Sequence, residues 1–203
     1  MGELMRIERR SERVDQAGQF VSVKCGGAAI PVRHPLVRDA LVQAALDPTI
    51  RLIEYLPAVQ TAPAAMKVDA ITIERNDGRY YLDVVEARPR RSIAQRLMVA
   101  RALLDLGIRA LVRTESDIMR EPRCTNARSV WEYAGRPIEM GLRLQVLGAL
   151  ENEGAMTLGD LLSCLRSDRD PAPAVMAMSC LGLIDLDLGA APIGPATLVR
   201  HRG

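Results

Sequence analysis

The chain has 203 residues and is 48% hydrophobic, which is enough apolar material for one medium and one small domain and excludes a disordered class. Its 27 basic and 25 acidic residues leave a net charge of +2, so any nucleic-acid-binding patch must be local. The four cysteines lack CxxC or Cys/His spacing, which argues against a structural zinc site or a catalytic Cys/His pair. Neither a membrane-spanning apolar run nor a secretory signal is recognisable, so we expect a cytoplasmic protein without membrane contact.

The first part of the chain predicts an arm, a small hairpin and a helix. Residues 1–18 are highly charged, and we expect a solvated arm or an irregular first helix there. Residues 20–30 alternate weakly in polarity, which predicts a short strand or hairpin at a sheet edge. Residues 35–47 carry apolar side chains at helical spacing, and the helix is expected to stop before Pro48 because the residue preceding proline avoids helical backbone.

The next segment predicts three strands, a helix and a fourth strand. The strands are expected at residues 50–55, 68–74, 80–87 and 110–114, with a tight turn at residues 76–78. A helix over residues 92–106 is expected to begin at a serine cap and to point five apolar side chains inward, namely Ile93, Leu97, Ala100, Leu103 and Leu104. Residues 19–134 therefore predict an αβββαβ domain.

Residues 135–203 predict a second, smaller domain, with a polar stretch at residues 120–128 before it. Three helical patterns followed by a two-stranded hairpin have the order of a winged helix. Its recognition helix, expected at residues 172–181, contains no basic residue and is therefore a poor reader of DNA bases. We expect a structural or protein-docking role, with Met176 and Met178 either exposed to a partner or in the core.

Two carboxylates on neighbouring predicted strands form the first candidate site. Asp69 and Glu86 can hold a divalent cation beside a phosphate, and the positive charge of Arg88 can stabilise the developing negative charge. Alternation along a strand places Glu86 and Arg88 on one face and Asp83 on the other, at the surface. The competing interpretation is a solvated strand edge or salt bridges to the many arginines.

The element order, Asp69, the triplet Glu86-Ala87-Arg88 and the run from Ala110 to Asn126 resemble the PD-(D/E)XK nuclease superfamily and, within it, the TnsA-like transposon endonucleases. That resemblance implies a restriction-endonuclease-like αβββαβ core followed by a C-terminal winged helix. It also implies Mg²⁺ or Mn²⁺ bound by Asp69 and Glu86, with Asp39 of the first helix completing the site. The expected partners are DNA, a transposase subunit and an AAA+ ATPase.

Three departures from the family pattern bear on activity. Val68 stands where a proline precedes the aspartate, Asp39 stands where a glutamate is usual, and Arg88 replaces the lysine. A guanidinium is a poor partner for a water nucleophile, because it lacks the compact ammonium on a flexible stem. A relocated lysine at Lys67 is a weaker alternative.

A basic cluster follows the Glu86 strand, and it predicts passage of a phosphate backbone near the metal site. Beyond Arg88, its members are Arg90, Arg91, Arg96 and Arg101, the predicted DNA-binding residues. Gln95 lies in the same helix and is either exposed or lines the cleft. The sequence thus predicts a metal-dependent DNA endonuclease or its degenerate descendant. The alternatives are a catalytically inactive nuclease fold that acts as a DNA-associated or assembly module, and a winged helix transcription regulator.

Overall fold

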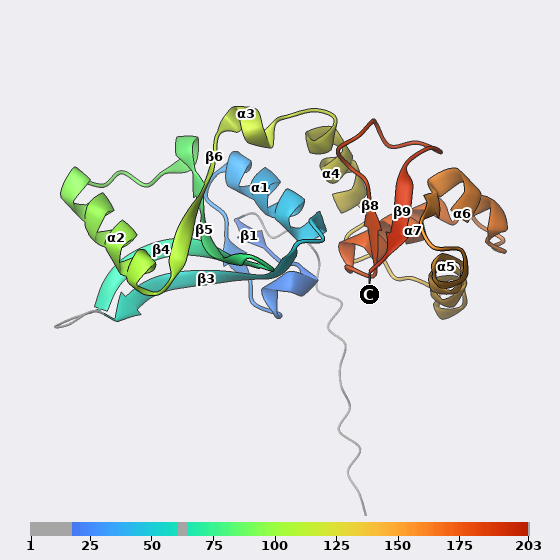
Figure 1. The fold of residues 1–203 in the computed structure, drawn as a ribbon, viewed down its shortest axis with the longest axis horizontal. Coiled ribbons are helices and arrows are strands. Elements are labelled where there is room, and N and C mark those ends of the chain that lie inside the picture. The colour runs from blue at the N-terminus through green and yellow to red at the C-terminus, as the bar shows by residue number, and fades with distance from the viewer. Residues whose placement is uncertain (1–17, 61–64, 203) are drawn as a thin grey trace, which may run out of the picture.

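The structure is a computed structural model that describes residues 18–60 and 65–202 (Figure 1). Residues 1–17 of the predicted arm lie outside the described residues. The described chain is a mixed α/β protein with a four-stranded mixed sheet and α-helices α1 to α7. In Figure 1, α2 and strands β3 to β6 occupy one half of the molecule and α5 to α7 with β8 and β9 the other.

The first half follows the predicted order of helix, three strands, helix and strand. Its elements are β1 (Gln19–Phe20), the 3₁₀ helix η1 (Val23–Cys25), β2 (Ile30–Pro31), α1 (Pro35–Leu46), β3 (Ile50–Gln60), β4 (Ala65–Arg75), β5 (Gly78–Val84), the 3₁₀ helix η2 (Val85–Ala87), α2 (Ile93–Asp105) and β6 (Ile108–Arg113). β1 and β2 pair as the expected short hairpin. The main sheet has the order β3-β4-β5-β6, with β5 and β6 parallel and the other pairs antiparallel.

Local signals explain the helix boundaries in this half. Pro35 opens α1, His34 accepts a hydrogen bond from the Leu36 amide, and the helix ends before Pro48 as predicted. Ser92 and Gln95 form a reciprocal capping box at the start of α2. Gln95 therefore caps its own helix.

α1 and α2 cover opposite faces of the sheet. Val84 of β5 is buried against α1, whereas Tyr81 packs with Val68 and with Leu103 of α2. Because side chains alternate along a strand, these contacts place the helices on different faces. The prediction of which α2 side chains point inward is wrong except at Leu103. The other four side chains (Ile93, Leu97, Ala100 and Leu104) are exposed, because the face of α2 turned to the sheet runs through Val99, Ala102 and Leu103.

A short helical segment connects the two halves. The structure has α3 (Glu115–Ile118) after β6, and α4 (Arg123–Trp131) where the sequence suggested a polar stretch at residues 120–128. Asn126 of α4 is buried, and its polar atoms are all hydrogen-bonded. Its amide nitrogen donates to the carbonyls of Leu188 (2.9 Å) and Ala191 (2.8 Å), and its oxygen accepts from the Ile193 amide. The Asn126 side chain thus holds a loop of the C-terminal half against α4.

The second half contains helices and a three-stranded antiparallel sheet of order β7-β9-β8. Its elements are α5 (Met140–Glu153), β7 (Met156–Thr157), α6 (Leu158–Cys164), α7 (Ala172–Cys180), β8 (Ile184–Leu186) and β9 (Leu198–His201). α7 is buried along residues 175–180, so the suggestion that Met176 and Met178 are exposed is wrong and the core alternative is confirmed.

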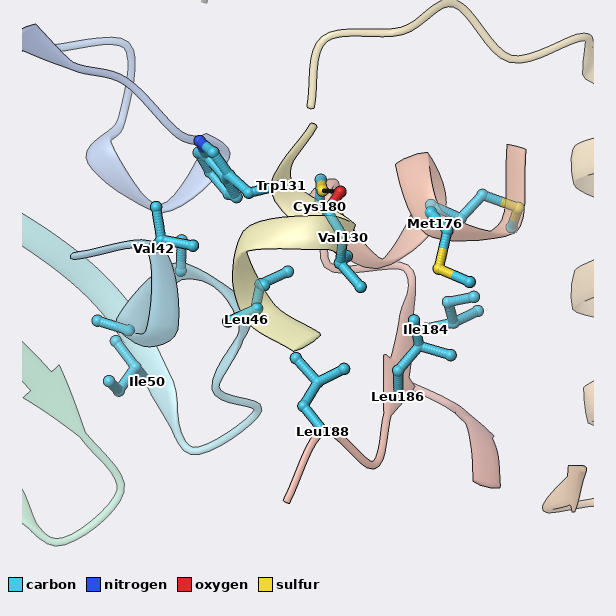
Figure 2. Packing of buried hydrophobic residues seen from close by; sticks show 14 of the residues in the cluster. Val42, Leu46, Ile50, Val130, Trp131, Met176, Cys180, Ile184, Leu186 and Leu188 are labelled. Carbon is cyan, nitrogen blue, oxygen red and sulfur yellow. Dashed lines mark hydrogen bonds between the residues drawn. The ribbon is translucent and has the colours of Figure 1, made fainter. Parts of the chain in front are cut away.

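One hydrophobic cluster crosses both halves. Side chains of α1, α4, α7 and β8 belong to it (Figure 2), among them Leu46, Val130, Met176 and Ile184. The thiol of Cys180 in α7 donates to the Val130 carbonyl of α4 at 3.3 Å, which adds a polar contact inside this cluster. α7 therefore serves as a core helix between the halves.

Candidate functional site

Asp69 lies at a β-bulge in β4. Leu56 of β3 pairs with Ala70, but Ala58 pairs with Lys67, so Val68 and Asp69 together oppose Pro57 alone. Proline has no amide hydrogen to give to the ladder, which explains why the pairing is interrupted there. Asp69 has a φ of 54°, the one positive φ at a non-glycine position among the described residues. Aspartate tolerates this left-handed conformation better than most residues, and such strain of about 1–3 kcal/mol is typical of functional sites.

Both carboxylate oxygens of Asp69 accept hydrogen bonds. Arg33 Nη1 donates to Oδ2 at 2.5 Å, and the Tyr55 hydroxyl donates to Oδ1. Burial alone would raise the pKa of Asp69, but the hydrogen bonds from Tyr55 and Arg33 outweigh it and lower the pKa. Asp69 is therefore an ionised carboxylate with both oxygens engaged by side chains.

Glu86 and Arg88 do not share a strand face, contrary to the prediction. β5 ends at Val84, and Glu86 lies exposed in the 3₁₀ turn that follows, so the two-residue alternation no longer applies. Arg88 instead binds Asp83 with two parallel hydrogen bonds, Nε to Oδ1 at 2.8 Å and Nη2 to Oδ2 at 2.6 Å. The hydrogen bond to Asp83 raises the pKa of Arg88. Asp83, expected at the surface, has a side chain that is only 15% exposed.

Asp39 of α1 is bound by an arginine of α4. The guanidinium of Arg128 binds both of its oxygens, at 2.9 and 2.7 Å. The Asp39 side chain is 13% exposed, so this pairing satisfies a carboxylate that is mostly removed from water. The first helix therefore presents its acid to Arg128.

These contacts do not fit a bound Mg²⁺ or Mn²⁺. Such a cation needs several free oxygen ligands at short range, whereas the oxygens of Asp39, Asp69 and Asp83 each accept from arginine or tyrosine. Among residues 18–60 and 65–202, no group of three or more His, Cys, Asp or Glu side chains is arranged to hold a metal ion. A cation would have to displace Arg33 from Asp69 before it could bind.

Basic side chains surround Asp69 on two sides. Asp69 lines a cavity of about 370 Å³ together with Arg88 and Arg96, and a second cavity of about 480 Å³ together with Arg90 and Lys67. Arg91 borders both cavities. This arrangement places positive charge beside the bulge, as phosphate binding requires.

Two of the predicted DNA-binding arginines already have protein partners. Arg91 donates to the Val68 carbonyl at 2.5 Å and so holds the bulge, and Arg101 pairs with Asp105 one helical turn later at 2.9 Å. Of the four predicted DNA-binding arginines, Arg91 and Arg101 therefore make contacts within the protein, whereas Arg90 and Arg96 border the cavities.

Sequence reasoning missed Arg33, Tyr55 and Asp83 as parts of this site. A proline inside a long strand signals a bulge, so Pro57 could have indicated an irregular partner strand at Asp69. Arg33 and Tyr55 come from segments 36 and 14 residues away from Asp69, and no local pattern connects them.

Comparison of the sequence with protein-family models and with curated proteins found no match. No helix in the described part of the chain is long and apolar enough to cross a membrane.

Proposed function

We propose that this chain is a catalytically silent nuclease-fold protein that serves as an assembly module beside DNA. One observation carries the proposal: both oxygens of Asp69, the central acid of the expected site, are bound by Arg33 and Tyr55. An arginine that neutralises the metal-binding carboxylate competes directly with a divalent cation for the same oxygens. Arg88 is likewise engaged with Asp83 and is not directed at a water nucleophile.

The nuclease ancestry in this proposal rests on the element order and on the bulge. A helix, three antiparallel strands, a helix and a parallel strand precede a unit of three helices and a three-stranded sheet, the order expected of a TnsA-like core and winged helix. By the same resemblance, a transposase subunit and an AAA+ ATPase are the proposed partners. The buried recognition helix α7 supports a structural role for the C-terminal unit.

A metal-dependent endonuclease is the second candidate, and the strained bulge favours it. Asp69 keeps a left-handed backbone between two cavities bordered by arginines, which is the placement a phosphodiester substrate requires. In that case a cation and DNA would together displace Arg33, and Asp69 and Glu86 would become the ligands.

The decisive experiment is cleavage of plasmid and branched DNA with Mg²⁺ or Mn²⁺. We expect no cleavage by the wild type, by Arg88→Lys or by Arg33→Ala, because Arg88→Lys leaves Asp69 bound to Arg33, whereas Arg33→Ala leaves Tyr55 on Asp69 and leaves Arg88 bound to Asp83. Metal-dependent cleavage by the wild type that disappears in both Asp69→Asn and Glu86→Ala would refute the proposal and establish the endonuclease. Cleavage that appears only in Arg88→Lys would show that the arginine at position 88 alone inactivates the site. It would also refute the proposal that the pairing of Asp69 with Arg33 prevents cation binding.

A further inference from the structure

α2 presents an apolar stripe to solvent. Ile93, Leu97, Ala100 and Leu104 recur at intervals of four, three and four residues, which is the spacing of a helix-pairing seam. Their large side chains are well exposed, with Ile93 at 70%, Leu97 at 66% and Leu104 at 57%. In Figure 1, α2 lies at the end of the molecule farthest from α5 to α7, so the C-terminal half does not cover this stripe.

The stripe borders an apolar groove over the sheet. Ile93, Leu97 and Ala100 line the 370 Å³ cavity together with Val68 and Tyr81 of the sheet. On β6, Val112 is 51% exposed, and it alternates onto the same face as Ile108, which packs against Leu103 of α2. Large apolar side chains are thus exposed on both α2 and β6, and contiguous apolar surface of this kind marks interaction sites.

The charges around the stripe identify the kind of partner. Arg96 and Arg101 flank the seam, and Arg88 and Arg91 border the groove. Arg101 pairs with Asp105, and Arg88 pairs with Asp83, which also borders the groove. Asp69 also borders the groove, and its charge is compensated by Arg33, so Arg91 and Arg96 give this rim its net positive charge. A second copy of α2 would bring further arginines to this basic rim, which like-charge repulsion disfavours. An acidic partner would be attracted to it.

We infer that this face docks an amphipathic helix of a partner protein whose apolar stripe is flanked by Asp or Glu. The helix lies along α2 and over the groove, its apolar side chains cover Leu97 and Leu104, and its carboxylates face Arg91 and Arg96. The inference rests on the proposed assembly role and specifies the surface through which assembly occurs. An interface made of one helix face and exposed charge pairs is typical of a transient complex.

Two labelled synthetic helical peptides of three heptads test the inference by fluorescence anisotropy. They share a leucine seam and differ only in carrying Glu or Lys beside it. We expect the Glu peptide to bind the full chain and the Lys peptide to bind at least about tenfold more weakly, with added salt reducing the difference. Leu97→Gln should weaken binding of the Glu peptide about tenfold, whereas Leu144→Gln on α5, where the leucine is 63% exposed, should not change it.

The remaining outcomes overturn the inference. These are absence of binding, equal binding of both peptides, or equal loss in the two leucine variants when circular dichroism shows both to be folded. Sedimentation that reveals a dimer dissolved by Leu97→Gln would assign the face to self-association, and Leu97-dependent binding of duplex DNA without peptide binding would assign it to DNA. The peptide assay requires neither metal nor cleavage, so its failure is distinguishable from failure of the proposed function.

Discussion

Replacing Met178 of α7 by alanine should destabilise both halves of the molecule together. Met178 is fully buried in the cluster that also contains Leu46 of α1 and Ile184 of β8. Loss of its three outer heavy atoms costs about 2 kcal/mol of transfer free energy. A cavity of roughly 70 Å³ would add up to about 2 kcal/mol if nothing relaxed. We therefore expect the free energy of unfolding to fall by about 2–4 kcal/mol.

The assay is urea unfolding followed by two probes. Trp131 is the single tryptophan and stacks on Phe20, with ring centroids 5.2 Å apart, so its fluorescence reports on α4 and the N-terminal hairpin. Circular dichroism reports on all helices. Because one core crosses both halves, the two curves should coincide and shift together in Met178→Ala. The reasoning is refuted if the fluorescence transition stays at the wild-type midpoint while the dichroism curve splits. An exposed control, Leu144→Ala, should change the stability by less than about 0.5 kcal/mol.

Three further predictions concern charged groups. Burial lowers the pKa of Lys24 to about 8, so between pH 8 and 10.5 its side chain binds more protons in the unfolded state, and it contributes a rise in the free energy of unfolding of up to about 3 kcal/mol over that range. In urea titrations, the difference in stability between the wild type and Lys24→Met should therefore change by that amount between pH 8 and 10.5, whereas the difference from the exposed Lys67→Met should stay constant, and a constant Lys24→Met difference would contradict this. Asp69 has a lowered pKa and stabilises the fold above its unfolded pKa near 4, so Asp69→Asn should lose less stability than the wild type on acidification below about pH 4, and equal acid slopes would contradict this. A double-mutant cycle of Asp39→Asn and Arg128→Ala should give a coupling of about 1 kcal/mol, since the pair is bidentate and its carboxylate is shielded; a coupling near zero would show that the pairing is not held in solution.

Local sequence signals predicted most of the architecture. Proline at the start of α1, the serine cap of α2 and the turn between β4 and β5 each restrict the backbone within a few residues. The order of strands and helices follows from such signals, because the 2.0 and 3.6 periodicities reflect which side chains meet the core. The mixed α/β class was therefore predictable.

The end of β5 and the burial of α2 were not predictable in the same way. Residues 80–87 alternate as a strand would, yet the chain turns after Val84, and Ala87 packs against the α1 side of the sheet. In α2, the exposed stripe has the periodicity of a buried face. Apolar residues at helical spacing indicate a face that makes apolar contacts, but they do not indicate whether those contacts are within this chain or with another molecule.

Ion pairing explains why the expected site does not form in this structure. The lysine of the resembled motif can approach a water molecule through a flexible stem, whereas the planar guanidinium of Arg88 binds both oxygens of one carboxylate. Asp69 and Asp39 have arginine partners of their own from distant segments. Reversing Arg88→Lys would free Asp83 but leave Asp69 bound to Arg33. Asp69 and Asp83 line the same cavity, so a cation held by these two carboxylates requires the combined changes Arg33→Ala and Arg88→Lys. Calorimetric titration of that double variant with Mn²⁺ should show binding that neither single variant shows, whereas binding by the wild type would contradict this account.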